Sequence, residues 1–566
     1  MVRLRVELLR DNAEYLRLRD AIHKYHVGAV AMSAPRGGRF LRRDRGYRTV
    51  EILNQLQNES KLPLLVAGDF EQGVLPARLF GTTVFPHAMA FGAAGKIEYA
   101  EEFGRITAQE SRAIGVHWNL FPVADVNSNP ANPIIGTRAF GADPKEVGDL
   151  VAAYIRGARA NGMLTTAKHF PGHGNTATDS HLAVARVDDD LKTLTAVDLP
   201  PFRKAIEAGV DAIMTAHVRV PALDPDPDHV ATTSPKVVTD LLKHQLGFKG
   251  LVVADALDMA GVSRLYRANP GRPAVDAFKA GNDVLTMPGD LDASYRAVLE
   301  AVRSGEISET RLNESVMKIL RAKASLGLAR NRLVDITAIA QRVGLPQNLA
   351  VGQRISDDSI TLGRDNGKLL PLTARSSMKP HQRARPAWHK LLVIILCDSV
   401  RAEDGRVLER EIRARRADAN VLYLDPNTAS QQSNDVLQAV GQAQAVVAAV
   451  HIVPSAARSM RIGRKSKHPA SLPDSTSALL EKILAKAGER TAVLAMGSPY
   501  LTDDFPAIQN YICTFSNATV SEVSAAKALF GEIPIHGHMP VNLANNGAQT
   551  SSDARAAQMV KVKTHQ

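Results

Sequence analysis

The stretch AKHFPGHGNTATDSHL, residues 167–182, gathers five titratable side chains around two glycines and a proline. Glycine and proline favour a shaped loop over a helix, so these side chains can converge on one site. Asp179 and His181 are separated by one residue, and a turn there can place the carboxylate against an imidazole nitrogen. Such a contact fixes the tautomer of the ring and stabilises its protonated form, which suits a histidine to acid and base catalysis near neutral pH. We therefore interpret Asp179 and His181 as a candidate proton-transfer pair.

The same histidine-rich loop is poorly suited to a metal ion. Its three histidines lack the spacing of helical zinc ligands, and Lys168 would repel a cation. The two cysteines, Cys397 and Cys513, are too few for a disulfide framework or a cysteine-based metal site. We expect no metal site, and a loop that is merely a hydrogen-bonded turn stays open as an alternative.

Asp255 lies at the end of the apolar run GLVVADAL, residues 250–257. Burial of an unpaired carboxylate costs several kcal/mol, so such a residue is usually functional or well hydrogen-bonded. Hydrolysis of a glycosidic bond with retention needs a carboxylate nucleophile on one face of the sugar and a proton donor on the other. Asp255 and His181 can fill these roles, whereas Asp258 is better explained as a residue at a helix N-terminus.

Short apolar runs alternate with helically spaced stretches from about residue 27 to residue 290, which indicates βαβ units and a parallel sheet. Seven strands can be counted, at 27–33, 62–70, 117–126, 164–170, 211–218, 250–257 and 283–287. Most of them finish in charged or polar residues, which are Asp69 and Glu71, Asp125, Lys168 and His169, His217, and Asp255. A (β/α)8 barrel builds its active site from strand ends around a ring, whereas an open doubly wound sheet uses one switch point. The number of polar strand ends favours a TIM-type (β/α)8 barrel, in which one strand is missing from the count.

The hydrophobic pattern divides the chain into two folded domains. Residues 1–345 are expected to form the barrel, and residues 346–389 a connecting segment and linker, because 373–389 lack apolar periodicity. The pattern of short apolar strands restarts at residue 390, which predicts a smaller α/β/α sandwich over residues 390–545. Residues 546–566 are polar and aperiodic, so we expect a disordered tail.

The 566-residue chain has a formal net charge of +11, which raises the question of a polyanionic partner. The basic residues are dispersed, and few aromatic residues accompany the densest basic stretch at 458–467, so we expect no nucleic-acid partner. No apolar run reaches 18 residues, and we expect no membrane insertion. The N-terminus has no apolar core of a secretory signal, so the sequence as it stands predicts a cytoplasmic protein.

Motifs along the chain resemble those of glycoside hydrolase family 3, in particular its β-N-acetylglucosaminidase branch. In order they are GDFEQG with Arg78, FPVADVNSNPANPIIGTRAFGADP (121–144), KHFPGHGNTATDSH (168–181), MTAHVRVPALD (214–224) and GLVVADALDM (250–259). KHFPGHG followed by D-S-H is specific to that branch. The runs SITLGRDNGKLLPL (359–372), GSPYL (497–501) and ALFGEIPIHGHMPVNL (528–543) look like the second domain of two-domain members. The resemblance thus covers nearly the whole chain.

This resemblance implies roles for individual residues. It makes Asp255 the nucleophile and Asp179 with His181 the acid/base dyad. It implies that the terminal sugar is bound by Asp69, Arg78, Arg138, Lys168 and His169. Lysine and arginine can donate to sugar hydroxyls while an aspartate accepts from two of them. The family needs no metal or organic cofactor, so none is expected.

The N-terminal region departs from the family pattern. The usual D-Q-E-G-G is D-F-E-Q-G here, and Arg78 comes one residue later than its family counterpart. The family's opening helix and first strand have no counterpart before residue 27, so either the start is truncated or the barrel closes with seven strands. With a truncated start, an export signal could have been lost as well, and export is then the alternative to a cytoplasmic location.

These features predict a retaining exo-hydrolase that releases terminal β-linked N-acetylglucosamine from glycans or muropeptide fragments through a glycosyl-aspartate intermediate. Carbohydrate is therefore the expected partner. Three alternatives stay open: a β-glucosidase or broad-specificity exo-glycosidase of the same family, a phosphorylase, and a non-catalytic glycan-binding protein.

Overall fold

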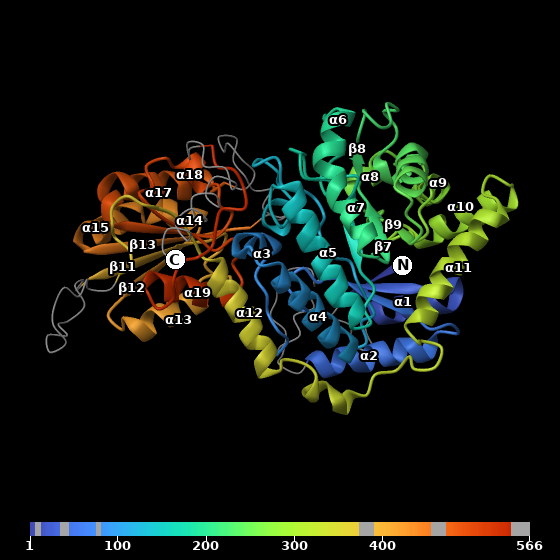
Figure 1. Cartoon of the computed structure of the whole chain (residues 1–566), viewed down its shortest axis with the longest axis horizontal. Helices are drawn as coiled ribbons and strands as arrows, with labels where there is room; N and C mark the ends of the chain where they lie inside the picture. The colour runs from blue at the N-terminus through green and yellow to red at the C-terminus, as the bar shows by residue number, and fades with distance from the viewer. Residues whose placement is uncertain (6–12, 34–44, 75–80, 373–389, 454–470, 545–566) are drawn as a thin grey trace, which may run out of the picture. The chain divides into compact units, whose positions relative to one another are not determined.

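The computed structural model describes residues 1–5, 13–33, 45–74, 81–372, 390–453 and 471–544 (Figure 1). The chain forms two compact units. The first comprises Met1–Val84, Ile97–Asn129 and Asp143–Val351, and the second comprises Phe85–Lys96, Pro130–Ala142 and Gly352–Gln566. The segments 85–96 and 130–142 thus belong to the second unit, although the sequence-based division placed them in the barrel. The predicted linker 373–389 and tail 546–566 lie outside the described residues.

Parallel strands build the first unit. Four of them pair in the order β1 (Val2–Arg5), β2 (Ala29–Ser33), β3 (Leu65–Gly68) and β4 (Trp118–Asn119). Three more pair in the order β5 (Thr166–Phe170), β7 (Ala212–Thr215) and β9 (Leu251–Ala254). A short parallel pair, β6 (Ala185–Arg186) with β8 (Val218–Arg219), is formed by loops that follow β5 and β7.

Backbone contacts join the two sets of strands into a closed ring. Isolated parallel bridges connect β4 to β5, and β9 to the segment 284–287. The Met287 N–H then donates to the Met1 carbonyl at 2.8 Å, which joins this segment to β1. The ring therefore closes between the segment 284–287 and β1, and the first unit is a complete (β/α)8 barrel.

β1 corrects the expectation that one barrel strand is missing. It runs parallel to β2, and its residues Val2 and Leu4 are buried while Arg3 between them is half-exposed. A four-residue strand that alternates apolar and charged residues differs from the continuous apolar runs typical of buried parallel strands. The strand was missed for that reason, although the alternation itself is a strand signal.

Arg3, a charged residue in β1, forms an ion pair with Asp258, which follows β9. Arg3 Nη1 lies 2.7 Å from Asp258 Oδ2, and Nη2 lies 3.3 Å from Oδ1. Asp258 is therefore the partner of a barrel arginine, and it also lies next to a helix N-terminus, the position that the sequence predicted for it. The short helix that follows, α8 (Ala260–Ser263), has Met259 at its N-cap position.

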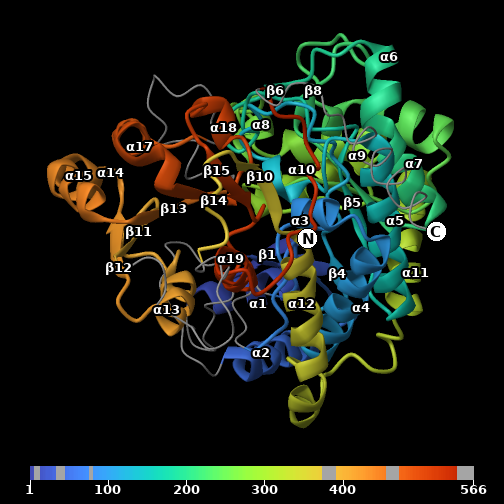
Figure 2. The same ribbon diagram turned by 60° about the vertical axis from the view of Figure 1, so that its left-hand side comes forward.

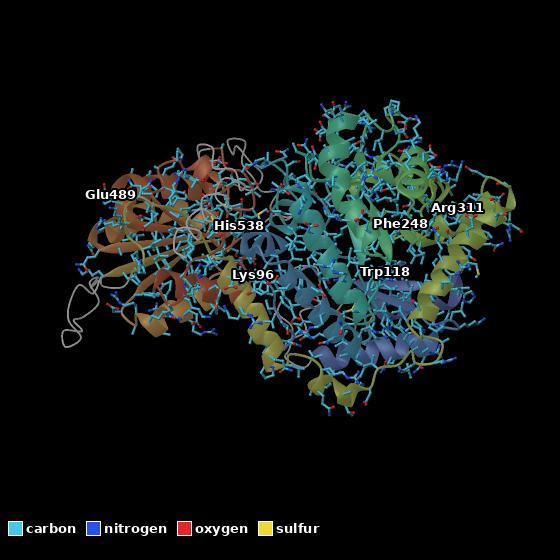
Figure 3. The ribbon with its side chains drawn as sticks, viewed as in Figure 1. Lys96, Trp118, Phe248, Arg311, Glu489 and His538 are labelled. Atoms are coloured by element: carbon cyan, nitrogen blue, oxygen red, sulfur yellow. The ribbon has the colours of Figure 1, made fainter. Side chains whose placement is uncertain are left out.

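Helices alternate with the strands around the ring. They are α1 (Ala13–Tyr25), α2 (Arg45–Glu59), α4 (Ile97–Ala113), α5 (Pro144–Ala160), α7 (Leu199–Glu207), η5 (Lys236–Gln245), α9 (Arg272–Ala280), α10 (Leu291–Arg303) and α11 (Glu309–Ser325). Successive strand residues point to opposite faces. In β2, Ala29 and Ala31 join the interior cluster around Trp118, which is labelled in Figure 3. Val30 and Met32 instead pack with residues of α1 and α2.

A six-stranded sheet forms the second unit. Its order is β10 (Thr361–Asp365), β15 (Asn510–Cys513), β14 (Thr491–Gly497), β13 (Ala445–Ile452), β11 (Leu391–Leu396) and β12 (Asn420–Leu424). All neighbours are parallel except β10, which runs antiparallel to β15. The predicted connecting segment 346–389 therefore contributes an edge strand and, before it, α12 (Pro346–Ser359).

Helices cover both faces of this sheet (Figure 2). One face packs on α15 (Ser433–Gln442) and α17 (Asp474–Ala487), and the other on α13 (Arg406–Arg415) and α19 (Thr519–Leu529). β11 and β13 are buried along their whole length, which explains their continuous apolar sequence. The second unit is thus an α/β/α sandwich, as expected. Within the described parts of both units, no helix is long and apolar enough to cross a membrane.

A buried carboxylate ties the last barrel strand to α11. Asp283 is fully buried and accepts from Arg311 Nη1 at 3.2 Å and Lys318 Nζ at 3.0 Å; Arg311 is labelled in Figure 3. Burial raises the pKa of Asp283, but Lys243, Lys318 and the hydrogen bonds outweigh burial and lower it. The carboxylate is therefore ionised in the folded barrel.

Asp283→Asn is expected to lower the free energy of unfolding at pH 7 by about 3–5 kcal/mol, because it leaves two partly buried cations without their carboxylate. Denaturant unfolding measures the loss. Since the folded-state pKa is lowered, the stabilisation is present above the unfolded pKa and is lost as the pH falls through the folded one, so the two proteins should converge in acid. Asp292→Asn is the control, because that carboxylate is 36% exposed and should cost less than about 1 kcal/mol. Equal losses for the two variants would contradict this account.

Candidate active site

Polar side chains from several strands share the C-terminal rim of the ring. Asp69 directly follows β3, Lys168 and His169 end β5, and Asp255 directly follows β9. Lys168 Nζ reaches Asp69 Oδ1 at 2.6 Å, and the charge of His169 acts on Asp255. The structure thus brings together four of the residues predicted for the site.

Asp255 is held as a carboxylate. Its Oδ1 accepts the Ala256 N–H at 2.7 Å. Burial raises its pKa, but His217, His169 and His181 together with that N–H outweigh burial and lower the pKa to about 2. A half-buried carboxylate that is ionised at neutral pH can act as a nucleophile.

Asp179 and His181 form the predicted pair. Asp179 Oδ1 accepts both the His181 backbone N–H at 2.8 Å and the ring Nδ1 at 2.9 Å. Because a carboxylate only accepts, Nδ1 carries the proton in this contact and Nε2 is the ring atom left for proton transfer. The Asp179 side chain is 2% exposed and the His181 ring 42%, so a buried anion supports a ring that solvent or substrate can reach.

Glycines shape the loop between β5 and this pair. A Cβ on Gly174 would lie 1.6 Å from the Val126 carbonyl oxygen, so only glycine fits there. Gly172 has φ +141°, a conformation that other residues rarely adopt, and a Cβ on it would meet Asp198. The two glycines let the loop pass close against the segment that follows β4.

His173 holds this loop from inside. Its Nδ1 lies 2.7 Å from Thr176 Oγ1 and its Nε2 lies 2.9 Å from Ser180 Oγ. Burial lowers the pKa of His173 to about 4, so the ring is neutral near pH 7. His173 therefore positions the residues on either side of it, in particular the turn that carries Asp179.

Lys168 carries a buried charge that two carboxylates neutralise. Its side chain is 3% exposed, and Nζ reaches Asp69 Oδ1 at 2.6 Å and Glu71 Oε1 at 2.8 Å. Asp69 is 54% exposed, which leaves room for a ligand hydroxyl at its other oxygen. Glu71 was not among the predicted site residues. Its position at a polar strand end was visible in the sequence, but its pairing with Lys168 was not.

Asp125 organises the other side of β5, and it is a second polar strand-end residue to which the sequence assigned no role. It is fully buried, and its Oδ2 accepts His169 Nδ1 at 2.7 Å. Its oxygens also accept the backbone N–H of His169 at 3.2 Å and of His173 at 2.7 Å. Burial raises the pKa of Asp125, but these two histidines outweigh burial and lower it. The buried carboxylate therefore fixes both the loop backbone and the orientation of the His169 ring.

His217 is a third residue that the predicted site lacked. Its Nε2 donates to the Ala256 carbonyl at 3.0 Å, and its Nδ1 lies 2.9 Å from Thr232 Oγ1. Burial lowers the pKa of His217, and the contact with the Ala256 carbonyl fixes a proton on Nε2. His217 thus holds the backbone next to Asp255. Its place at the end of β7 was visible in the sequence, but its partner was not.

Two of the predicted sugar ligands, Arg78 and Arg138, are not among the described residues of the first unit. Arg78 lies outside the described residues. Arg138 lies in η2 (Gly136–Arg138), a segment of the second unit, where its Nη1 donates to the Ile134 carbonyl at 3.0 Å. Sugar binding by either arginine stays a prediction.

Known proteins share this sequence pattern and this fold. Residues 4–322 match the profile described as the glycosyl hydrolase family 3 N terminal domain. Beta-hexosaminidase A of Pseudoalteromonas piscicida is 32% identical over 434 residues, which cover 70% of this chain and 71% of that protein. The beta-N-acetylglucosaminidase/beta-glucosidase of Cellulomonas fimi is 32% identical over 363 residues, which cover 62% of this chain and 63% of that protein.

A solved structure agrees over almost the whole chain. The glycoside hydrolase family 3 beta-N-acetylglucosaminidase from Paenibacillus sp. str. FPU-7 superposes with a TM-score of 0.81 at 29% identity, covering 96% of this chain and 97% of that one. Barrel, rim and sandwich all fall within these matches, and the profile alone spans more than half of the sequence. The chain belongs to glycoside hydrolase family 3.

Proposed function

We propose that this enzyme is a retaining exo-glycosidase that releases terminal β-linked N-acetylglucosamine. The observation that carries the proposal is the pairing of Asp179 with His181 on the same barrel rim as an ionised Asp255. The β-hexosaminidase and β-N-acetylglucosaminidase names of the similar proteins support the choice of sugar. Glycans and muropeptide fragments that end in this sugar are the proposed substrates.

The proposed reaction has two steps. Asp255 attacks the anomeric carbon while His181, protonated and paired with Asp179, gives its Nε2 proton to the departing glycosidic oxygen. The neutral His181 then takes a proton from water, whose oxygen displaces Asp255 and releases the sugar with its original configuration. The low pKa of Asp255 makes it a good leaving group in the second step.

We propose that the residues around Lys168 bind the terminal sugar. The exposed oxygen of Asp69 would accept from sugar hydroxyls, and Lys168 and His169 would donate to them. Arg78 and Arg138 are proposed as further ligands on the family resemblance alone.

Phosphorolysis is a second candidate, because a histidine acid/base is neutral after it gives up its proton and does not repel an anionic phosphate. In that reaction phosphate oxygen replaces water in the second step and the product is the sugar 1-phosphate.

One assay separates these candidates. The purified chain is incubated with an aryl β-N-acetylglucosaminide or the matching aryl β-glucoside, with and without phosphate, and products are followed by NMR. We expect faster turnover of the N-acetylglucosaminide, phosphate-independent release of free sugar, and the β-anomer as the first product. Preferred cleavage of the glucoside would indicate a β-glucosidase, sugar 1-phosphate would indicate a phosphorylase, and binding without turnover would indicate a glycan-binding protein.

Asp255→Asn is expected to lower kcat by about three orders of magnitude or more, since an amide cannot form the glycosyl ester. Mass spectrometry should locate a 5-fluoro sugar label on Asp255 in the unchanged protein. Asp240→Asn makes the same change on an exposed part of η5 and should leave kcat unaltered. Labelling of a different carboxylate would refute the assignment.

His181→Ala is expected to slow substrates with poor leaving groups by about 10²–10⁴-fold, because the departing oxygen no longer receives a proton. A dinitrophenyl glycoside needs no such proton, so the variant should release one equivalent of phenol in a burst and then turn over slowly. His244→Ala, at an exposed position of η5, is the control. Full turnover of both substrates by His181→Ala would exclude the proposed role.

A further inference from the structure

A second cavity lies at the other end of the barrel, at the N-terminal side of β4. It has a volume of about 320 Å³ and lies where the end of α4 and the start of β4 meet the segment that follows α11. Its polar lining includes Arg112, His117, Arg332 and Arg342, with Asp335 as the one carboxylate among the lining residues. All these residues belong to the first unit, and none of them takes part in the rim around Asp255.

Arg112 is the central feature of this cavity. It lies in the last turn of α4 and is half-buried, and its guanidinium has no hydrogen bond or ion pair with any residue that the structure describes. Burial lowers its pKa. A guanidinium keeps its proton at any physiological pH, so its partial burial without a partner has a cost that a bound anion would remove.

His117 adds a neutral donor. The residue is 4% exposed, and its Nδ1 accepts the Val66 N–H at 3.2 Å, so Nε2 is the nitrogen that carries the proton. Burial, with a smaller effect of Arg112, lowers its pKa to about 3. The ring therefore stays neutral and offers the cavity an N–H with a fixed tautomer.

Two more guanidinium groups complete the lining. Arg332 Nη1 donates to the Ser60 carbonyl oxygen at 3.1 Å. Arg342 is exposed at the end of η6 (Ile336–Gln341). The Asp335 Oδ1 is already engaged by the Thr337 N–H at 2.9 Å and Oγ1 at 2.7 Å. The charge of Arg342 also acts on this carboxylate and helps to lower its pKa, so the lining carries three cations and one carboxylate.

We propose that this cavity is a binding site for a small organic phosphate. A phosphate group carries up to two charges and three acceptor oxygens, which suits several guanidinium groups and one N–H donor better than a single carboxylate would. The volume lies at the lower end of the range of small-molecule sites. Apolar side chains of Val334 and Ala338 in the lining leave room for a small non-polar part of the ligand.

Inorganic pyrophosphate is the probe, and isothermal titration of the full chain at constant ionic strength is the measurement. We expect one saturable site, and Arg112→Gln should weaken it by about tenfold or more, as expected for a charge-assisted hydrogen bond. Arg342→Gln, an exposed change, provides a second variant if Arg112→Gln does not fold. Arg321→Gln, on the exposed side of α11, removes the same charge elsewhere and should bind as the unchanged protein does.

Further measurements test whether binding in this cavity is independent of the glycosidase site. Asp255→Asn and an excess of N-acetylglucosamine should both leave pyrophosphate binding unaltered, and the activity of Arg112→Gln should be unchanged. The proposal is overturned if no saturable binding occurs, if Arg112→Gln and Arg342→Gln bind normally, if the sugar displaces pyrophosphate, or if citrate binds as tightly. None of these outcomes depends on which glycoside the enzyme cleaves.

Discussion

Closure of the parallel strand ring is the constraint from which the candidate site follows. Because every strand runs in the same direction, the residues that follow β3, β4, β5, β7 and β9 all emerge at one rim. Closure needs β1 between β2 and the segment 284–287, and the ion pair of Arg3 with Asp258 crosses this junction. Without that strand, the ring would be open between β2 and the segment 284–287, which pairs with β9.

The rim concentrates charge in a partly buried place, and each charge has an opposite one nearby. Lys168 lies between two carboxylates, and Asp125 accepts hydrogen bonds from His169 in β5 and from His173 in the loop that follows. The balance between burial and neighbouring charges also gives Asp255 and His173 different protonation states. Asp255 stays ionised because histidines surround it, whereas His173 is kept neutral by burial. The His181 ring is 42% exposed and is supported by the buried Asp179 carboxylate, which leaves its Nε2 accessible to a ligand.

Local chain geometry also serves the site. Gly174 allows the loop to touch the backbone after β4, and this close contact is what brings Asp125 beneath the loop. His217 fixes the Ala256 carbonyl and so the direction in which the chain leaves β9. These contacts are made by residues that never touch the sugar in the proposed reaction, yet they set the geometry of those that would.

Sequence alone was sufficient where the chemistry is local. Asp179 and His181 are two residues apart, so any turn at that point pairs them, and the residue types at the strand ends favoured a barrel with a site on its rim. The apolar strands β11 and β13 likewise predicted the second sheet, because strands buried on both faces must be apolar throughout.

Tertiary structure decided what depends on distant partners. The sequence placed Asp125, Glu71 and His217 at polar strand ends, but it assigned them no role. Their roles follow from partners far away in the sequence, which are His169, Lys168 and Ala256 respectively. β1 was missed for a similar reason, since the charge of Arg3 within a barrel strand is neutralised by Asp258, which is distant in the sequence. Residue spacing along the chain indicates turns and strands. The pairing of opposite charges depends on which strands become neighbours in the folded barrel.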